Sequence, residues 1–107
     1  MIRVKFLVGN RQLAGFEIRG HADFADIGED IVCASVSSAA YMVANTVTDI
    51  IRADAKATAD DGEMALLVEN PCERTETVLK GLELHLTELV KQYPDNIKII
   101  YGGVKNA

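Results

Sequence analysis

Apolar and polar residues alternate at the start of the chain, which predicts two extended segments. Residues 2–8 place Ile2, Val4, Phe6 and Val8 on one face, and residues 14–19 repeat the alternation. Between the two runs, Gly9-Asn10 provides turn chemistry because both residue types tolerate positive φ. The pattern predicts a β-hairpin that ends close to Gly20-His21.

From Asp30 to about Arg52 the spacing of apolar residues changes to three and four, which predicts a helix. The predicted apolar stripe is Val32, Val36, Ala39, Ala40, Val43, Val47 and Ile50. We expect Asp30 to be the N-cap, because its carboxylate can accept from the free N–H groups of a first turn. Cys33 then falls at the third helical position, on the margin between core and solvent.

A second hairpin and a second helix follow. Asp60-Asp61-Gly62-Glu63 separates extended runs at 55–59 and 64–69, and Asp-Gly between such runs favours a hairpin. Asn70 as N-cap, Pro71 at the first position and Glu73 in a capping box predict a helix start. Its apolar stripe is Val78, Leu79, Leu82, Leu86, Leu89 and Val90, and 92–95 (Gln-Tyr-Pro-Asp) ends it. Ile97, Ile99 and Tyr101 then alternate in a last strand that ends at Gly102-Gly103.

The predicted order of elements is therefore ββαββαβ, in a single domain spanning residues 1–107. Two hairpins make the sheet mostly antiparallel, and two amphipathic helices need that sheet to cover their apolar stripes. The fold class expected is α+β.

Composition restricts the possible partners and location. The 107 residues carry a net charge of −5, which repels phosphate backbones, so we expect no direct nucleic-acid binding and instead a basic partner. The N-terminus lacks the apolar centre of a signal peptide, and we find no run of about 20 apolar residues that would span a membrane. We therefore expect a cytoplasmic protein whose two cysteines are free thiols.

Residues 22–29 show neither periodicity and contain three acids and a glycine, which indicates a mobile surface loop. Phe24 and Ile27 are the apolar exceptions. They either anchor the loop by packing beneath it, or contact an apolar substrate when the loop closes.

This loop separates the only histidine of the first eighty residues from a cysteine twelve positions later. A thiolate at Cys33 is favoured by a helix N-terminus and by a nearby imidazolium, and His21 can later return its proton to a leaving amine. Free N–H groups of the first helical turn, including that of Cys33, could form part of an oxyanion hole. The acids at positions 23, 26, 29 and 30 favour a charged His21 but oppose the thiolate, so spacing leaves the balance open.

Two other interpretations of these residues stay open at this point. In the first interpretation, neither residue is catalytic: Cys33 is a small buried hydrophobe and His21 is a surface residue. In the second, His21, Asp23, Asp26, Glu29 and Asp30 form a cluster of hard metal ligands, although their spacing matches no known site.

The sequence around both residues resembles a known family. Gly20-His21-Ala22 followed by Gly28-x-Asp30-Ile31-Val32-Cys33-Ala34-x-Val36-Ser37 is similar to the signature of the bacterial ribosomal-processing cysteine proteases called Prp. The later 92–94 (Gln-Tyr-Pro) and 102–104 (Gly-Gly-Val) extend the resemblance over nearly the whole chain. Ser35 departs from the pattern, since the family more commonly has Ala there.

The resemblance implies a catalytic dyad in which Cys33 is the nucleophile and His21 the general base, without a metal or cofactor. Gly20, Asp30 and Ser37 match the signature and are expected to have supporting roles. The implied substrate is the precursor of the large-subunit ribosomal protein numbered twenty-seven, cut after a short apolar N-terminal extension. The family is also similar in forming homodimers and in its ββαββαβ order.

Three residues complete the expectations. Cys72 begins a helix without a neighbouring histidine and is interpreted as structural, and His85 is expected to be solvated. Leu84 faces away from its helix's apolar stripe and is a candidate dimer contact. The competing function is a non-catalytic ribosome-assembly or peptide-binding module on the same fold.

Overall fold

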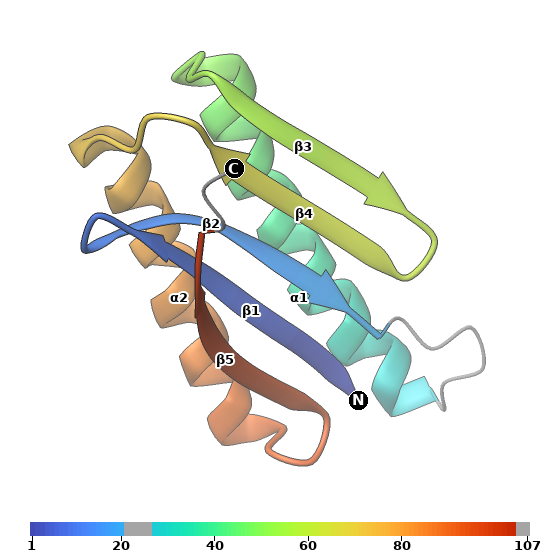
Figure 1. Ribbon diagram of the computed structural model, residues 1–107. Coiled ribbons are helices and arrows are strands. Elements are labelled where there is room, and N and C mark those ends of the chain that lie inside the picture. Colours follow the sequence, from blue (N-terminus) through green and yellow to red (C-terminus); the bar gives the residue numbers. More distant parts are fainter. Residues whose placement is uncertain (21–26, 105–107) are drawn as a thin grey trace.

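Five strands and two helices make up the chain, in the order ββαββαβ (Figure 1). The structure is a computed structural model that describes the backbone of residues 1–20 and 27–104 and the side chains of 1–20 and 31–104. The strands are β1 Ile2–Gly9, β2 Gln12–Arg19, β3 Ala55–Asp60, β4 Glu63–Val68 and β5 Ile97–Gly103. The helices are α1 Ile27–Asn45, continued by a π-helical segment η1 Thr46–Ile50, and α2 Glu73–Gln92.

The strands form one sheet in the order β3-β4-β2-β1-β5. The pairs β1–β2, β2–β4 and β3–β4 are antiparallel, while β1–β5 is parallel. Asn10 and Arg11 both have positive φ, 52° and 64°, which is the geometry of a type I′ hairpin turn and identifies the turn that the sequence left unresolved. The predicted α+β class and the mostly antiparallel sheet are confirmed.

Both helices lie on the same face of the sheet, α1 behind β2 and β4 and α2 behind β1 and β5 (Figure 1). The core is built from alternate strand residues and from the helix stripes that cover them. Its fully buried members include Val4, Phe6, Phe16, Ile18, Leu66, Val32, Val36, Val47, Leu79, Leu82 and Leu86. No described element covers the opposite face of the sheet, which we call the open face.

Helix α1 begins earlier than the sequence predicted. Its first residue is Ile27, so residues 27–29 are helical and Asp30 is the fourth helical residue rather than the N-cap. Acidic residues are favourable anywhere in a first turn, because they interact with the helix dipole. Acid content alone therefore did not locate the cap. Cys33 becomes the seventh helical residue, not the third.

The other end of this helical segment also differs from the prediction in detail. The apolar stripe is buried as expected at Val32, Val36, Ala40, Val43 and Val47, but Ile50 is 73% exposed. Ile51 donates its N–H to the Thr46 carbonyl at 2.8 Å, an i→i+5 bond that widens the last turn. We attribute the exposure of Ile50 to this change of helical pitch, which rotates the last residues off the stripe.

Helix α2 is capped by Cys72, not by Asn70. The Cys72 N–H donates to the Thr75 hydroxyl at 3.0 Å, which is one half of a capping box. Thr75 is fully buried, so its hydroxyl needs partners and finds them at this helix start. The expected capping box through Glu73 is wrong for this reason.

The expectation that no apolar run could span a membrane is wrong by length and composition, because residues Ile31–Ile50 would be able to cross one. In this fold the segment is α1 with η1, and its apolar stripe packs against the sheet. We interpret it as the core helix of the domain.

Candidate active site

Gly20 directly follows β2 and immediately precedes the candidate base. Its φ of +103° belongs to the left-handed region, and a Cβ at this position would collide with the Met1 carbonyl. Its N–H donates to the Gly62 carbonyl in the β3–β4 turn at 3.1 Å. A side chain at position 20 would therefore disturb the point at which the chain leaves the sheet. His21 lies outside the described residues, as do Phe24 and the rest of 21–26.

Cys33 is half-buried on one flank of α1 and packs against the edge of the core. At about 100° per residue, its side chain points about 60° to one side of Val36, the residue that faces the sheet. The α1 residues that face α2, such as Ala39, point to the other side. The thiol therefore lies on the flank of α1 that faces away from α2, at the rim of the core as predicted.

The expected contribution of the helix start to Cys33 is wrong in its geometry. Seven residues into α1, the Cys33 N–H belongs to the helix interior, where backbone N–H groups bond to the carbonyl four residues earlier. It is therefore not free to join an oxyanion hole. The influence of the helix dipole also decays within the first turn, so it contributes less at Cys33 than expected.

The structure describes the other expected supporting residues, Ser37 and Asp30, to different extents. Ser37 follows Cys33 by one turn on the same flank and is half-buried. Asp30 belongs to the first turn of α1, and its side chain is outside the described residues. Ser35, the departure from the family signature, donates its hydroxyl to the Ile31 carbonyl at 2.8 Å and is thus accommodated within the helix.

Acidic side chains gather at the β3–β4 turn next to Gly20. Asp60, Asp61 and Glu63 are all exposed, and the Gly20–Gly62 hydrogen bond attaches this turn to the chain that leads to His21. Only Glu63 of the three forms an ion pair with a described residue, with Arg19 at 3.6 Å. The segment before His21 therefore has an acidic neighbour that comes from a distant part of the sequence.

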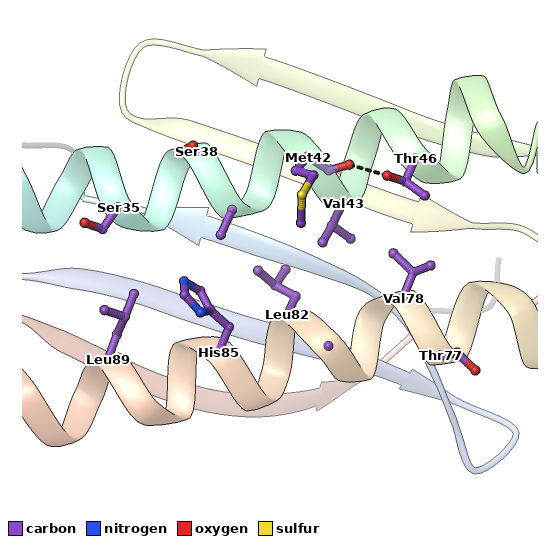
Figure 2. Close-up of a pocket in the computed structure, with 12 residues that line it drawn as sticks. Ser35, Ser38, Met42, Val43, Thr46, Thr77, Val78, Leu82, His85 and Leu89 are labelled. Carbon is purple, nitrogen blue, oxygen red and sulfur yellow. Dashed lines mark hydrogen bonds between the residues drawn. The ribbon is translucent and has the colours of Figure 1, made fainter.

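A cavity lies elsewhere, between α1 and α2 (Figure 2). This interhelical groove has a volume of about 710 Å³, and Cys33 does not line it. Its floor includes Val43, Val78 and Leu82, while Met42 and His85 stand at its walls, and Ala39 also lines it. Sequence reasoning missed the groove because each helix showed only its sheet-facing stripe. His85 is exposed, as expected, but it borders this cavity.

Cys72 is exposed and forms no disulfide, like Cys33. The Thr75 N–H and hydroxyl hydrogen-bond its sulfur and lower the pKa of the thiol, because they stabilise the thiolate. No histidine is near it in sequence, and its place at the cap of α2 agrees with a structural role.

Within the described ranges, no group of three or more His, Cys, Asp and Glu side chains could hold a metal ion. The alternative metal cluster around His21 and Asp23 lies in residues or side chains that are not described.

The fold and the signature together define the class as a cysteine-type peptidase. A family model described as cysteine protease Prp matches residues 1–98. The chain therefore belongs to the Prp family of cysteine proteases.

Individual relatives agree with this assignment. The ribosomal processing cysteine protease Prp of Bacillus subtilis is 26% identical over 99 residues, covering 84% of this chain and 87% of that protein. The structure of Prp from S. aureus in complex with a substrate peptide matches with a TM-score of 0.86 and 23% identity, over 95% of this chain and all of that one. SMU.848 from Streptococcus mutans matches with a TM-score of 0.85 and 23% identity, over 97% and 96% of the two chains.

Proposed function

We propose that this chain is a cysteine endopeptidase in which Cys33 is the nucleophile and His21 the general base. The observation that supports this most directly is the position of Cys33, half-exposed at the core margin of α1 in a chain of the Prp family. Gly20 supports it further, because the chain leaves β2 there in a conformation that favours glycine, one residue before His21.

In the proposed reaction, His21 accepts the Cys33 proton and the Sγ thiolate attacks the carbonyl carbon of the scissile peptide bond. The tetrahedral intermediate collapses as His21 gives that proton to the departing amine, leaving a thioester on Cys33. Water then attacks the thioester carbonyl with His21 as base, which releases the acid product and restores the thiol. Because Cys33 lies two turns into α1, activation depends on the imidazole rather than on the helix start.

We propose a ribosomal-protein precursor as the substrate, in line with the name of the B. subtilis relative. The specific candidate is the large-subunit protein numbered twenty-seven, cut after an apolar extension that is followed by a basic segment. The exposed acids Asp60, Asp61 and Glu63 beside Gly20, together with the net charge of −5, suit a basic peptide electrostatically. We place the reaction in the cytoplasm, where the two free cysteines would remain reduced.

We also propose that two copies associate through the face formed by α1 and α2. The interhelical groove opens there, and Met42 and Leu84 expose 66% and 64% of their surfaces beside Tyr41 at 48%. Apolar surface of this extent is typical of an interaction site. Met42→Lys should reduce the mass measured by light scattering to that of a monomer, while Lys56→Glu on the exposed strand β3 should leave it unchanged.

The decisive experiment offers a peptide with the precursor's N-terminal sequence to the protein under reducing conditions. Wild type and Cys72→Ala should cleave it, whereas Cys33→Ala and His21→Ala should not. Cys72→Ala is the matched control because it removes the other thiol of the chain. Intact peptide after incubation with folded wild type would contradict the endopeptidase. Binding of the peptide without cleavage would favour the alternative, a non-catalytic peptide-binding module.

A further inference from the structure

Three cationic side chains stand opposite one another across adjacent strands at one end of the sheet. Arg3 of β1 is in register with Arg19 of β2 on one side and with Lys98 of β5 on the other. All three are exposed. Directly opposed residues in a sheet have Cβ atoms about 4.5–5.5 Å apart. We call Arg19, Arg3 and Lys98 the cationic row.

The row lies on the open face of the sheet. The residues that flank it along the strands, Ile2, Val4, Ile18 and Ile97, are buried toward the helices. Since successive side chains of a strand alternate between faces, the cationic row points to the side that no described element covers. It is therefore accessible to a partner, as far as the described chain is concerned.

Like charges directly opposite one another destabilise a sheet. Of the three cations in the row, Arg19 alone pairs with a described carboxylate, that of Glu63 in β4, at 3.6 Å. Arg3 and Lys98 form none with any side chain that the structure describes. The arrangement thus concentrates positive charge at a cost to folding, which an anionic partner outside this domain would relieve.

The positive surface continues along the strands. Lys5 faces the same side one row further on, opposite Glu17 of β2. Its aliphatic chain covers Gly102, so the ammonium group is carried across β5. A cavity of about 390 Å³ beside the row is lined by Lys5 and Arg19, by the acidic Glu17, and by Leu7 and Leu67.

This concentration is not a result of overall composition. The chain has 16 acidic and 11 basic residues, yet β1, β2 and β5 contain four basic residues and a single acid, Glu17. The acids of the neighbouring edge, Asp60 and Glu63, lie on β3 and β4. Positive and negative charge are therefore separated along this end of the sheet.

We propose that the cationic row binds the phosphodiester backbone of RNA. A line of cations across a flat, open sheet face suits an extended chain of phosphates, and guanidinium groups bind phosphate with paired donors. The basic segment of the proposed substrate would be repelled by this row. The row therefore favours a different, anionic partner. The ribosomal context named for the B. subtilis relative makes RNA the anion at hand.

The same surface predicts binding without sequence preference. Tyr101, the aromatic residue of β5, stacks on Phe6 with ring centroids 5.9 Å apart and so belongs to the row of residues on the helix side. The outward positions of β1, β2 and β5 carry no aromatic side chain for base stacking. The row would contact only the phosphates of the RNA. Because the protein's net charge is −5, the rest of its surface would repel RNA, so binding would be confined to this patch. This proposal replaces the expectation, based on net charge, that nucleic acid is not contacted at all; it does not depend on the peptidase activity.

Fluorescence anisotropy with a labelled mixed-sequence single-stranded RNA of twelve nucleotides tests the proposal. Three phosphate contacts predict a log–log slope of affinity against salt of about −2, at about −0.7 per contact. Arg3→Gln/Lys98→Gln removes two of these contacts and should reduce the slope to about −0.7. At 0.1 M salt, the same loss should weaken RNA binding about 25-fold. Arg74→Gln/Lys80→Gln on α2 changes the net charge equally and should stay within about twofold of wild type on the same grounds.

Equal weakening by the α2 control would overturn the proposal, because it would assign the effect to net charge. Absence of RNA binding by wild type at low salt would overturn it too. Displacement of the RNA by an equimolar Glu-rich peptide would do the same, by assigning the row to an acidic protein. The double Gln variant should melt no lower than wild type, since it relieves repulsion between like charges. Its peptide cleavage rate should be unchanged, so that failure of this proposal is distinct from failure of the peptidase.

Discussion

The Gly20 N–H donates a hydrogen bond to the Gly62 carbonyl across 3.1 Å, and this joins the end of β2 to the β3–β4 turn. The two glycines are far apart in the chain and both have positive φ, 103° and 76°. Their contact brings the acidic turn beside the segment that leads to His21. It therefore links the acidic turn, which we propose favours a basic substrate, to the backbone just before the proposed base.

Gly20→Ala should destabilise the protein by about 1–3 kcal/mol and abolish most peptide cleavage. The reason is that alanine at positive φ is strained and its Cβ would collide with the Met1 carbonyl. Urea denaturation and a cleavage assay at a temperature where the variant is folded would measure the two effects.

Gly103→Ala is the matched control for this change. A Cβ at Gly103 meets no atom within 4 Å, so stability and cleavage should both remain close to wild type. A Gly20→Ala variant that cleaves the peptide at the wild-type rate would contradict a role of this backbone geometry in positioning His21.

Glu76→Ala should lower the free energy of unfolding by about 1–3 kcal/mol. The Glu76 carboxylate accepts a hydrogen bond from the Leu13 N–H at 2.9 Å and so links α2 to β2, while Leu13 itself is buried. Removal of the carboxylate leaves that N–H without its partner. Chemical denaturation measures the change, and Glu88→Ala on the exposed side of α2 should alter it by less than about 0.5 kcal/mol. If both variants lost equal unfolding free energy, the hydrogen bond to Leu13 would not be the source of the stabilisation.

Gly81→Ala should stabilise the monomer by about 0.5–1 kcal/mol, because glycine in a helix interior is unfavourable relative to alanine. A Cβ at Gly81 meets no atom within 4 Å, since the residue lines the interhelical groove. Thermal melting at low protein concentration measures this gain. A lower melting temperature there would mean that the groove closes in solution.

The Cys72 thiol should react with iodoacetamide at a lower pH than an ordinary exposed thiol, because the Thr75 N–H and hydroxyl lower its pKa. A pH series in the Cys33→Ala background isolates this residue. Thr75→Val removes the hydroxyl and should move the reaction midpoint upward, although the backbone bond remains.

The sign of the accompanying stability effect follows from the same shift. A thiol whose pKa is lower in the folded than in the unfolded state stabilises the fold above the ordinary thiol pKa, and this stabilisation is lost as pH falls through the lowered pKa. Below the lowered pKa, the Cys72 thiol therefore adds nothing to the stability of the fold. A reaction midpoint that is identical in Thr75→Val and in the background protein would contradict the assigned cause.

Local patterns predicted most of the fold because each strand and helix buries one face. The alternation at Val4, Phe6, Phe16 and Ile18 and the helical spacing at Val32 and Val36 correspond directly to buried positions. The helix starts were predicted poorly. Acids and small polar residues at 26–30 and 70–72 offered several caps, and tertiary contacts such as the burial of Thr75 chose among them.

The candidate site was only partly predictable for a related reason. The sequence singled out Cys33 and Gly20 through a local motif; Cys33 lies at the rim of the core, as predicted, and Gly20 has a positive φ. The acidic turn beside Gly20, the groove between α1 and α2 and the cationic row each depend on residues that come together through strand order and helix packing. A pattern confined to one segment carries no information about such neighbours. The roles of His21, Cys33, Gly20, Asp30 and Ser37 stay predictions.

The separation of Cys33 from the interhelical groove has a consequence for inhibitor discovery. A screen that detects ligands by thermal shift would select compounds for the groove, a cavity of about 710 Å³. Such compounds would leave the labelling of Cys33 by thiol reagents unaffected, because the thiol is on the other flank of α1. Cysteine-directed electrophiles would in turn meet the exposed Cys72 first. Selection by competition at Cys33 in a Cys72→Ala protein would avoid both problems.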